Sequence, residues 1–83
     1  NISVEYGRNN IRANCISPGL IKTDFARALW ENEDILRVTT AKSALKRIGM
    51  PDEIAGAAVY LASEAGSFMT GQNIVIDGGE SEQ

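Results

Sequence analysis

A short stretch in the first third of the chain combines residue types that could hold a flat ligand. Residues 11–16 have the mostly apolar pattern of a buried strand, and Pro18-Gly19 ends it abruptly. Proline fixes φ and lacks an N–H, whereas glycine lets the backbone approach a flat ring closely. Thr23 or Asp24 can then cap a helix. Because ligands of open α/β sheets bind just outside the carboxyl ends of strands, this stretch predicts one wall of a cofactor site.

The composition argues against several other kinds of site. The 83 residues include 8 basic and 11 acidic side chains, a net charge of −3 without a basic stripe, which argues against nucleic-acid binding. No apolar run approaches the roughly 18 residues of a membrane span. One cysteine and no histidine argue against a metal site. The lone cysteine fits a reducing compartment, so we expect a cytoplasmic protein.

Two strands flank a helical middle section in the predicted fold. We expect a helix after Thr23, a helical piece over about residues 33–46 and a longer helix over 51–63, which begins at Pro51. Residues 73–76 form the second strand, followed by a turn at Asp77. This order makes a βαβ unit with parallel strands, so the fold class is α/β.

The sequence also predicts that the chain is the carboxyl-terminal part of a longer protein. Asn1 is not an initiator methionine, and the residues after it have the pattern of the last turns of a helix. Gly7 is placed to end that helix in the left-handed conformation. Two parallel strands alone would also leave a large apolar area exposed.

The polar residues of the first strand and its cysteine have structural interpretations. Arg12 and Asn14 interrupt an apolar strand, so they need hydrogen-bond partners if they are enclosed. Cys15 is expected to be a small buried apolar residue.

Several short motifs occur in a recognisable order. They are Glu5-Tyr6-Gly7, Ile11-Arg12-Ala13-Asn14, Ile16-Ser17-Pro18-Gly19, Ile21, Thr23, Arg47-Ile48-Gly49-Met50-Pro51, Glu53-Ile54-Ala55, Tyr60-Leu61-Ala62-Ser63, Thr70-Gly71-Gln72 and Asp77-Gly78-Gly79. Each motif is weak alone, but the ordered series resembles the carboxyl-terminal third of the short-chain dehydrogenases/reductases. The resemblance covers essentially the whole chain.

The resemblance implies a fold and an activity for the intact protein. Residues 1–83 would be a carboxyl-terminal fragment of a single dehydrogenase domain, the last βαβ part of a Rossmann-type doubly wound sheet. Residues 24–46 would be the substrate lid, and about 51–76 the final helix and strand. The activity implied is that of an oxidoreductase that transfers a hydride between NAD or NADP and a small alcohol/carbonyl substrate.

The resemblance also implies roles for individual residues. Pro18 and Gly19 would lie against the nicotinamide, the backbone of Ile21 would pair with its carboxamide, and the Thr23 hydroxyl would bond to the carboxamide or a phosphate. From spacing alone, an ordinary strand-to-helix turn is favoured for Pro18 and Gly19. A cap is the simple alternative for Thr23, and both of its roles can coexist.

The family's catalytic Ser, Tyr and Lys have no counterpart in this chain. Tyr6 is followed four residues later by Asn10, and Tyr60 by Glu64, so neither tyrosine belongs to a Tyr-x-x-x-Lys motif. We therefore assign no catalytic residue and expect the 83 residues alone to be inactive.

Three apolar side chains of the expected lid are candidates for contact with substrate. Phe25, Leu29 and Trp30 share helical spacing, which suits either a substrate pocket or plain packing.

A non-catalytic remnant is the alternative function. Relatives of this fold usually form homo-dimers or tetramers through the last helix and strand, so residues 51–76 could be a self-association module. An autonomous nucleotide-binding domain is disfavoured, because nothing in the chain cradles a pyrophosphate.

Overall fold

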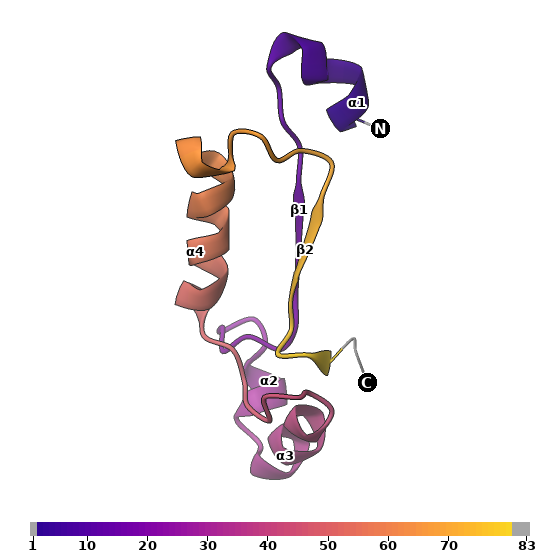
Figure 1. The fold of residues 1–83 in the computed structure, drawn as a ribbon. Helices are drawn as coiled ribbons and strands as arrows, with labels where there is room; N and C mark the ends of the chain where they lie inside the picture. The colour runs from indigo at the N-terminus through magenta and orange to yellow at the C-terminus, as the bar shows by residue number, and fades with distance from the viewer. Residues whose placement is uncertain (1, 81–83) are drawn as a thin grey trace.

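Two short parallel strands and one long helix form the framework that positions residues 18–23, the bend. The structure is a computed structural model that describes residues 2–80. Figure 1 shows α4 alongside the two strands and the helices α2 and α3 beyond one end of them. The elements are α1 (Ile2–Tyr6), η1 (Gly7–Asn9), β1 (Cys15–Pro18), α2 (Arg27–Trp30), α3 (Glu33–Ala41), α4 (Pro51–Ala62), η2 (Glu64–Gly66) and β2 (Asn73–Ile76).

The strands β1 and β2 pair in parallel, from Cys15 opposite Asn73 to Pro18 opposite Ile76. Parallel neighbours need a long crossover between them, and α2, α3 and α4 all lie within it. The structure therefore confirms the predicted α/β class and the parallel pairing.

The strand β1 begins later than the apolar pattern predicts. The pattern covers residues 11–16, whereas β1 starts at Cys15. The residues before it pair with a loop: the Ala13 N–H donates to the Thr70 hydroxyl at 3.1 Å, and the Gly71 N–H donates to the Ala13 carbonyl at 2.8 Å. A side-chain acceptor does not continue a backbone ladder, so regular pairing starts only where that loop becomes β2.

Two polar side chains hold this loop against the extended segment. Arg12 Nη1 donates to the carbonyls of Gly66 and Met69 at 2.9 and 3.2 Å. Asn14 donates to the Met69 carbonyl at 3.1 Å and accepts from the Gln72 N–H at 3.0 Å. Arg12 and Asn14 thus have the hydrogen-bond partners that were expected for them. These partners are backbone groups of the loop, whose own hydrogen-bonding needs the two side chains help to satisfy.

Two details at the start of the chain correct the sequence predictions. The left-handed residue is Asn10, with φ at 60°, and not Gly7, which instead begins the 3₁₀-helix η1. Asparagine adopts this conformation more readily than most residues, so the helical end continues for one tighter turn before it stops. Cys15 is exposed rather than buried, because within residues 2–80 α4 is the one helix that lies alongside the two-stranded sheet.

The expected lid forms two helices that are shorter than predicted. After Thr23 the chain makes a turn, and α2 begins only at Arg27. The amide oxygen of Asn32 then caps α3, accepting from the N–H groups of Asp34 and Ile35 at 2.9 and 3.2 Å. A side-chain cap of this kind fixes where the second helix starts.

The helix α3 ends at Ala41 and does not reach the expected end near Lys46. Beyond it, the Leu45 N–H donates to the Gly78 carbonyl at 2.9 Å, and Lys46 has a left-handed φ of 57°. The helix α3 therefore ends before the segment that contacts the turn after β2.

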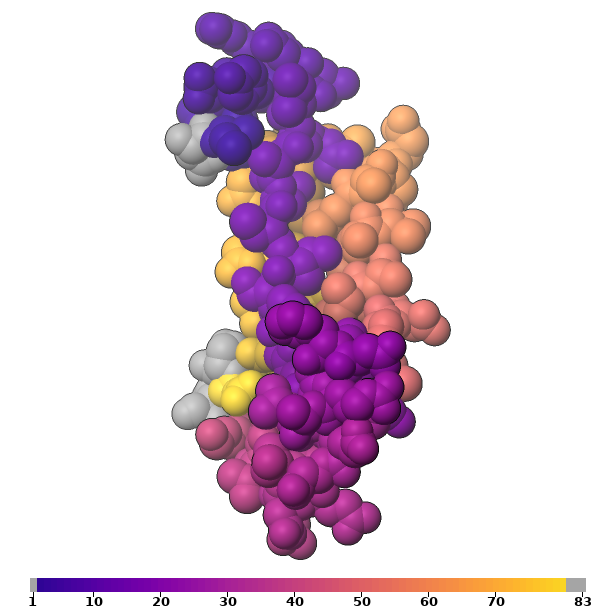
Figure 2. All heavy atoms as spheres, turned by 180° about the vertical axis from the view of Figure 1, so that it is seen from behind, coloured from indigo at the N-terminus to yellow at the C-terminus, as the bar shows by residue number. Residues whose placement is uncertain are grey.

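Apolar side chains are covered only in part. Within residues 2–80 no hydrophobic side chain is buried, and Phe25 and Phe68 are fully exposed. Figure 2 shows the narrow shape that results, with principal extents of 49 × 25 × 20 Å. The same residues contain no helix long and apolar enough to cross a membrane and no group of three potential metal ligands.

We predict that Arg12→Met lowers the free energy of unfolding of the intact protein by about 1.5–3 kcal/mol, the usual contribution of a charged hydrogen bond. The carbonyls of Gly66 and Met69 would each lose a charged donor and keep only a neutral one, the Met69 N–H and the Asn14 amide respectively. Urea unfolding measures the change, and Arg8→Met, on exposed η1, is the matched control. Equal losses in both variants would contradict the role given to Arg12.

Candidate functional site

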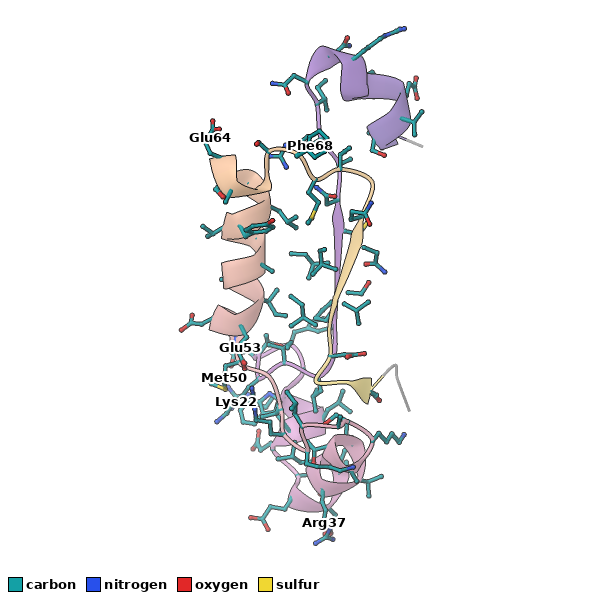
Figure 3. All side chains as sticks on the ribbon, in the orientation of Figure 1. Lys22, Arg37, Met50, Glu53, Glu64 and Phe68 are labelled. Carbon is teal, nitrogen blue, oxygen red and sulfur yellow. The ribbon has the colours of Figure 1, made fainter. Side chains whose placement is uncertain are left out.

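The bend leaves the sheet where both strands end. Pro18 is the last residue of β1, and the Gly19 N–H donates to the carbonyl of Ile76 at 2.9 Å. Figure 3 shows Lys22 of the bend in the region of Met50, and the Lys22 N–H donates to the carbonyl of the neighbouring Gly49 at 2.9 Å. The bend is therefore enclosed between the end of the sheet and the beginning of α4.

Glycine is required at position 19 by a contact within the chain. A β carbon there would lie 2.8 Å from Cα and 3.2 Å from the carbonyl oxygen of Asp77. Asp77 is part of a tight turn in which its carboxylate accepts from the Gly79 N–H at 2.9 Å, the turn-forming role expected for it. The contact with Asp77 is thus one reason for glycine at position 19. That Gly19 also allows the close approach of a ligand ring stays a prediction.

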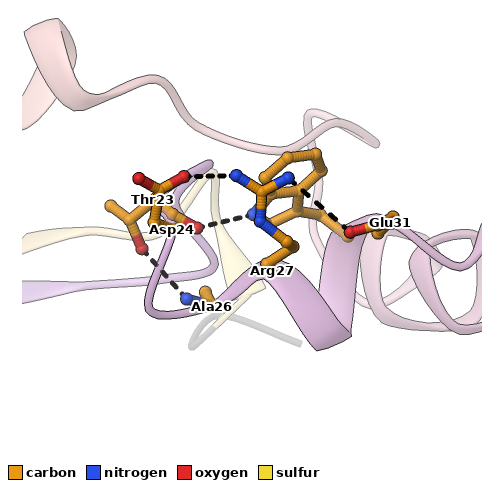
Figure 4. Close-up of polar contacts among 6 residues, drawn as sticks. Thr23, Asp24, Ala26, Arg27 and Glu31 are labelled. Atoms are coloured by element: carbon orange, nitrogen blue, oxygen red, sulfur yellow. Dashed lines mark hydrogen bonds and ion pairs between the residues drawn. The ribbon is translucent and has the colours of Figure 1, made fainter.

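Thr23 closes the bend through its backbone and its side chain. Its N–H donates to the Ile21 carbonyl at 2.8 Å, and its hydroxyl accepts from the Ala26 N–H at 3.2 Å (Figure 4). The indole of Trp30 donates to the Thr23 carbonyl at 2.7 Å. A hydroxyl that accepts one bond still has its own hydrogen to donate, so the capping contact leaves Thr23 able to bind a ligand.

The predicted cofactor residues line one apolar hollow of about 740 Å³. This volume lies in the range of small-molecule sites. Three segments form its walls: the bend, the α2–α3 region and the first turn of α4. The lining residues are Pro18, Gly19, Leu20, Ile21, Thr23, Ala26, Leu29, Thr39, Pro51, Ile54 and Ala55.

The three lid candidates are placed differently from one another. Leu29 lines the hollow, whereas Phe25 is fully exposed and Trp30 does not line it. The Trp30 ring packs instead against two cations, with Lys22 Nζ 5.1 Å and the Arg27 guanidinium carbon 5.3 Å from its centre. Arg27 in turn pairs with Asp24 at 2.6 Å (Figure 4). Trp30 therefore packs on the turn before α2, and its contact with substrate stays a prediction, as does that of Phe25.

A second segment, residues 47–50, fixes the bend from the side of α4, although its sequence predicted no part for it in the site. We call it the strap. Its Gly49 forms an isolated parallel bridge with Ile21. The Gly49 N–H donates to the Leu20 carbonyl, and the Lys22 N–H donates to the Gly49 carbonyl, both at 2.9 Å. The Arg-x-Gly-x-Pro spacing was the available signal, but a bridge to residues nearly thirty positions earlier is not visible in it.

A bidentate ion pair holds the strap to α4. The two terminal guanidinium nitrogens of Arg47 donate to the carboxylate of Glu53 at 2.9 Å, and the Met50 N–H donates to the same carboxylate at 2.9 Å. The Arg47 guanidinium, followed by this backbone N–H, lowers the pKa of Glu53 to about 2. The carboxylate is thus charged at any ordinary pH and also favours the positive end of the helix dipole.

Comparison with known proteins connects this arrangement to one group of enzymes. The family model described as enoyl-(acyl carrier protein) reductase matches residues 1–81. Dehydrogenase/reductase SDR family member 4 of Bos taurus is 43% identical over 79 residues, which are 95% of this chain and 28% of that protein. The 3-oxoacyl-(acyl-carrier-protein) reductase FabG of Chlamydia trachomatis is 46% identical over 78 residues, which are 94% of this chain and 31% of the reductase.

Solved structures of dehydrogenases also superimpose on nearly the whole of this chain. A 4-hydroxyisoleucine dehydrogenase complexed with NADH superimposes with a TM-score of 0.94 at 35% identity, over 99% of this chain and 34% of the enzyme. A short-chain type dehydrogenase/reductase from Mycobacterium ulcerans gives 0.92 at 37% identity, over 98% of this chain and 30% of that protein. The chain thus spans about a third or less of the lengths of these relatives.

We predict that Glu53→Gln removes a pH-dependent part of the stability. Because the folded pKa of about 2 lies below the ordinary value of 4.5, the carboxylate stabilises the fold above about pH 4.5, and that contribution is lost as the pH falls toward 2. In this window the Tm of the unmodified protein should fall more steeply than that of the variant. Exposed Glu64→Gln is the control and should keep the original slope; the same slope in Glu53→Gln would contradict the prediction.

Proposed function

The chain belongs to the short-chain dehydrogenase/reductase family, and on that premise we propose that it forms the carboxyl-terminal segment of a nicotinamide-dependent oxidoreductase. The intact protein would transfer a hydride between NAD or NADP and a small alcohol/carbonyl substrate. In this proposal residues 1–83 are the last βαβ part of one Rossmann-type domain. The superposition on a dehydrogenase complexed with NADH supports the choice of cofactor.

The observation that carries the proposal is the convergence of Pro18, Gly19, Ile21 and Thr23 on one apolar hollow at the carboxyl ends of the strands. Ligands of parallel sheets bind at that edge. The apolar walls suit the face of a nicotinamide ring, and the Thr23 hydroxyl suits the polar carboxamide or a phosphate. The residues present therefore fit the group that the family uses.

Each part of the segment then has a task. The bound nicotinamide supplies or accepts the hydride. Pro18 and Gly19 shape the wall against which its ring lies, while the backbone of Ile21 and the hydroxyl of Thr23 orient it. Leu29 contributes an apolar wall from the lid. Each of these contacts contributes modestly to binding, because a neutral hydrogen bond contributes only about 0.5–1.5 kcal/mol.

Assembly through the last helix and strand is the second candidate function. The helix α4 and the loop after it carry exposed apolar side chains, notably Val59, Tyr60 and Phe68. A surface of this kind suits a homo-dimer or tetramer. Sedimentation combined with cofactor titration separates the candidates: assembly without nucleotide binding would favour the non-catalytic remnant. In either case we place the protein in the cytoplasm, where the exposed thiol of Cys15 would stay reduced.

We predict that Thr23→Val raises the KM of the intact enzyme for its dinucleotide by about 2- to 12-fold, the equivalent of one neutral hydrogen bond. Valine keeps the shape of threonine but removes the hydroxyl. Steady-state kinetics at saturating substrate measures the effect. Thr23→Ser keeps the hydroxyl and should retain most of the affinity, and unchanged kinetics in Thr23→Val would remove Thr23 from the site.

We predict that the 83 residues alone turn over no substrate. The proton-transfer residues of the family have no counterpart in the chain, so a bound dinucleotide would lack its acid/base partner. The absorbance of NAD(P)H, followed with the purified 83-residue chain and a panel of alcohols and ketones, tests this. Consumption above the buffer control would refute it.

A further inference from the structure

The contact between the strap and the bend has a geometry that the proposed binding roles leave unexplained. Gly49 hydrogen-bonds to the backbone of Leu20 and of Lys22, the two residues on either side of Ile21. In a parallel bridge of this kind, the N–H of the residue between them points away from the bridging strand. The strap therefore fixes the direction of the bend while leaving the Ile21 N–H on the opposite side.

Gly49 also sets the position of the Ile21 side chain. A β carbon on Gly49 would lie 2.6 Å from Ile21 Cδ1, and its next neighbour, the Leu20 carbonyl oxygen, is 3.6 Å away. The close atom is the far end of a flexible side chain, which can move without unfolding the protein. Gly49 is also outside the left-handed region, so its backbone accepts alanine without strain.

The strap is itself held in place independently of the bend. Arg47 binds Glu53 through two hydrogen bonds and also donates to the carbonyl of Ile48 at 3.1 Å. The Met50 N–H adds a third bond to Glu53. A shift of the strap relative to α4 would have to break this set, so the position of Gly49 is determined by the first turn of α4.

We propose that Gly49 is a positioning residue for the dinucleotide: the absence of a side chain there sets where Ile21 lies in the hollow, and its two backbone bonds set the direction of the bend. This inference rests on the proposed function. Gly49 does not touch the cofactor in this scheme and acts only through Ile21, with Arg47 holding the strap to α4.

The test is a set of variants of the intact enzyme, with dinucleotide KM and kcat measured separately. Gly49→Ala should raise the KM on the order of 3- to 10-fold, comparable to the loss of one orienting contact, with kcat little changed. Gly56→Ala is the matched control, because a β carbon at Gly56 meets nothing within 4 Å. A merely structural role would lower the amount of active enzyme, and hence the apparent kcat, without raising the KM.

Rescue tests the contact itself. Ile21→Val lacks Cδ1, so Gly49→Ala should cost much less affinity in the Ile21→Val background than in the unmodified enzyme. An equal cost in both backgrounds would overturn the inference. If Gly49→Ala does not fold, Arg47→Met replaces it: release of the strap should raise the dinucleotide KM, and an unchanged KM would overturn the proposal.

The outcomes also separate this inference from the proposed function. If Thr23→Val raises the dinucleotide KM but Gly49→Ala does not, positioning by Gly49 is wrong and the proposed function stands. If the intact protein binds no dinucleotide at all, the proposed function fails and the inference fails with it.

Discussion

The direct approach of two backbone segments at the end of the sheet determines the rest of the site. Gly19 lies so close to Asp77 that no side chain fits between them, and its N–H is bonded to Ile76. This contact fixes the point at which the chain leaves the sheet. The bridge between Ile21 and Gly49 then fixes the direction in which it continues. The bend, held on both sides, lines the hollow together with the start of α4.

The sequence predicted those parts of the fold that depend on local chemistry. Pro18 and Gly19 end the first strand, Pro51 begins the long helix, and the apolar run at 73–76 forms the second strand. Each of these features follows from a backbone restriction or a short periodic pattern that the residues carry themselves. The cofactor roles of Pro18, Gly19, Ile21 and Thr23 do not follow from such local signals, which favour an ordinary turn; the family resemblance implied them.

The features that the sequence missed depend on contacts between distant segments. The start of β1 is set by a loop near Thr70, and the end of α3 by the turn at Gly78. The strap acquires its role only through its contacts with Ile21 and Glu53. Ile21 lies 28 positions before Gly49 in the sequence. The contacts of Trp30 are also of this kind. Its indole binds the Thr23 carbonyl and its ring lies against two cations, and only the turn after Thr23 brings these groups together. Helical spacing shows which side chains share a face, but not which neighbour that face meets.

The wide separation of the paired segments in the chain has a kinetic consequence. The hydrogen bonds of Arg12 and Asn14 span 54 to 58 residues, and the two strands lie equally far apart in sequence. Closing so long a loop loses chain entropy before any pairing energy is gained. The helices within the loop need no such closure and can form early, whereas β1 and β2 can pair only after the loop has closed. High contact order of this kind slows folding, so we expect the edge that carries the hollow to be among the last parts of the chain to become ordered.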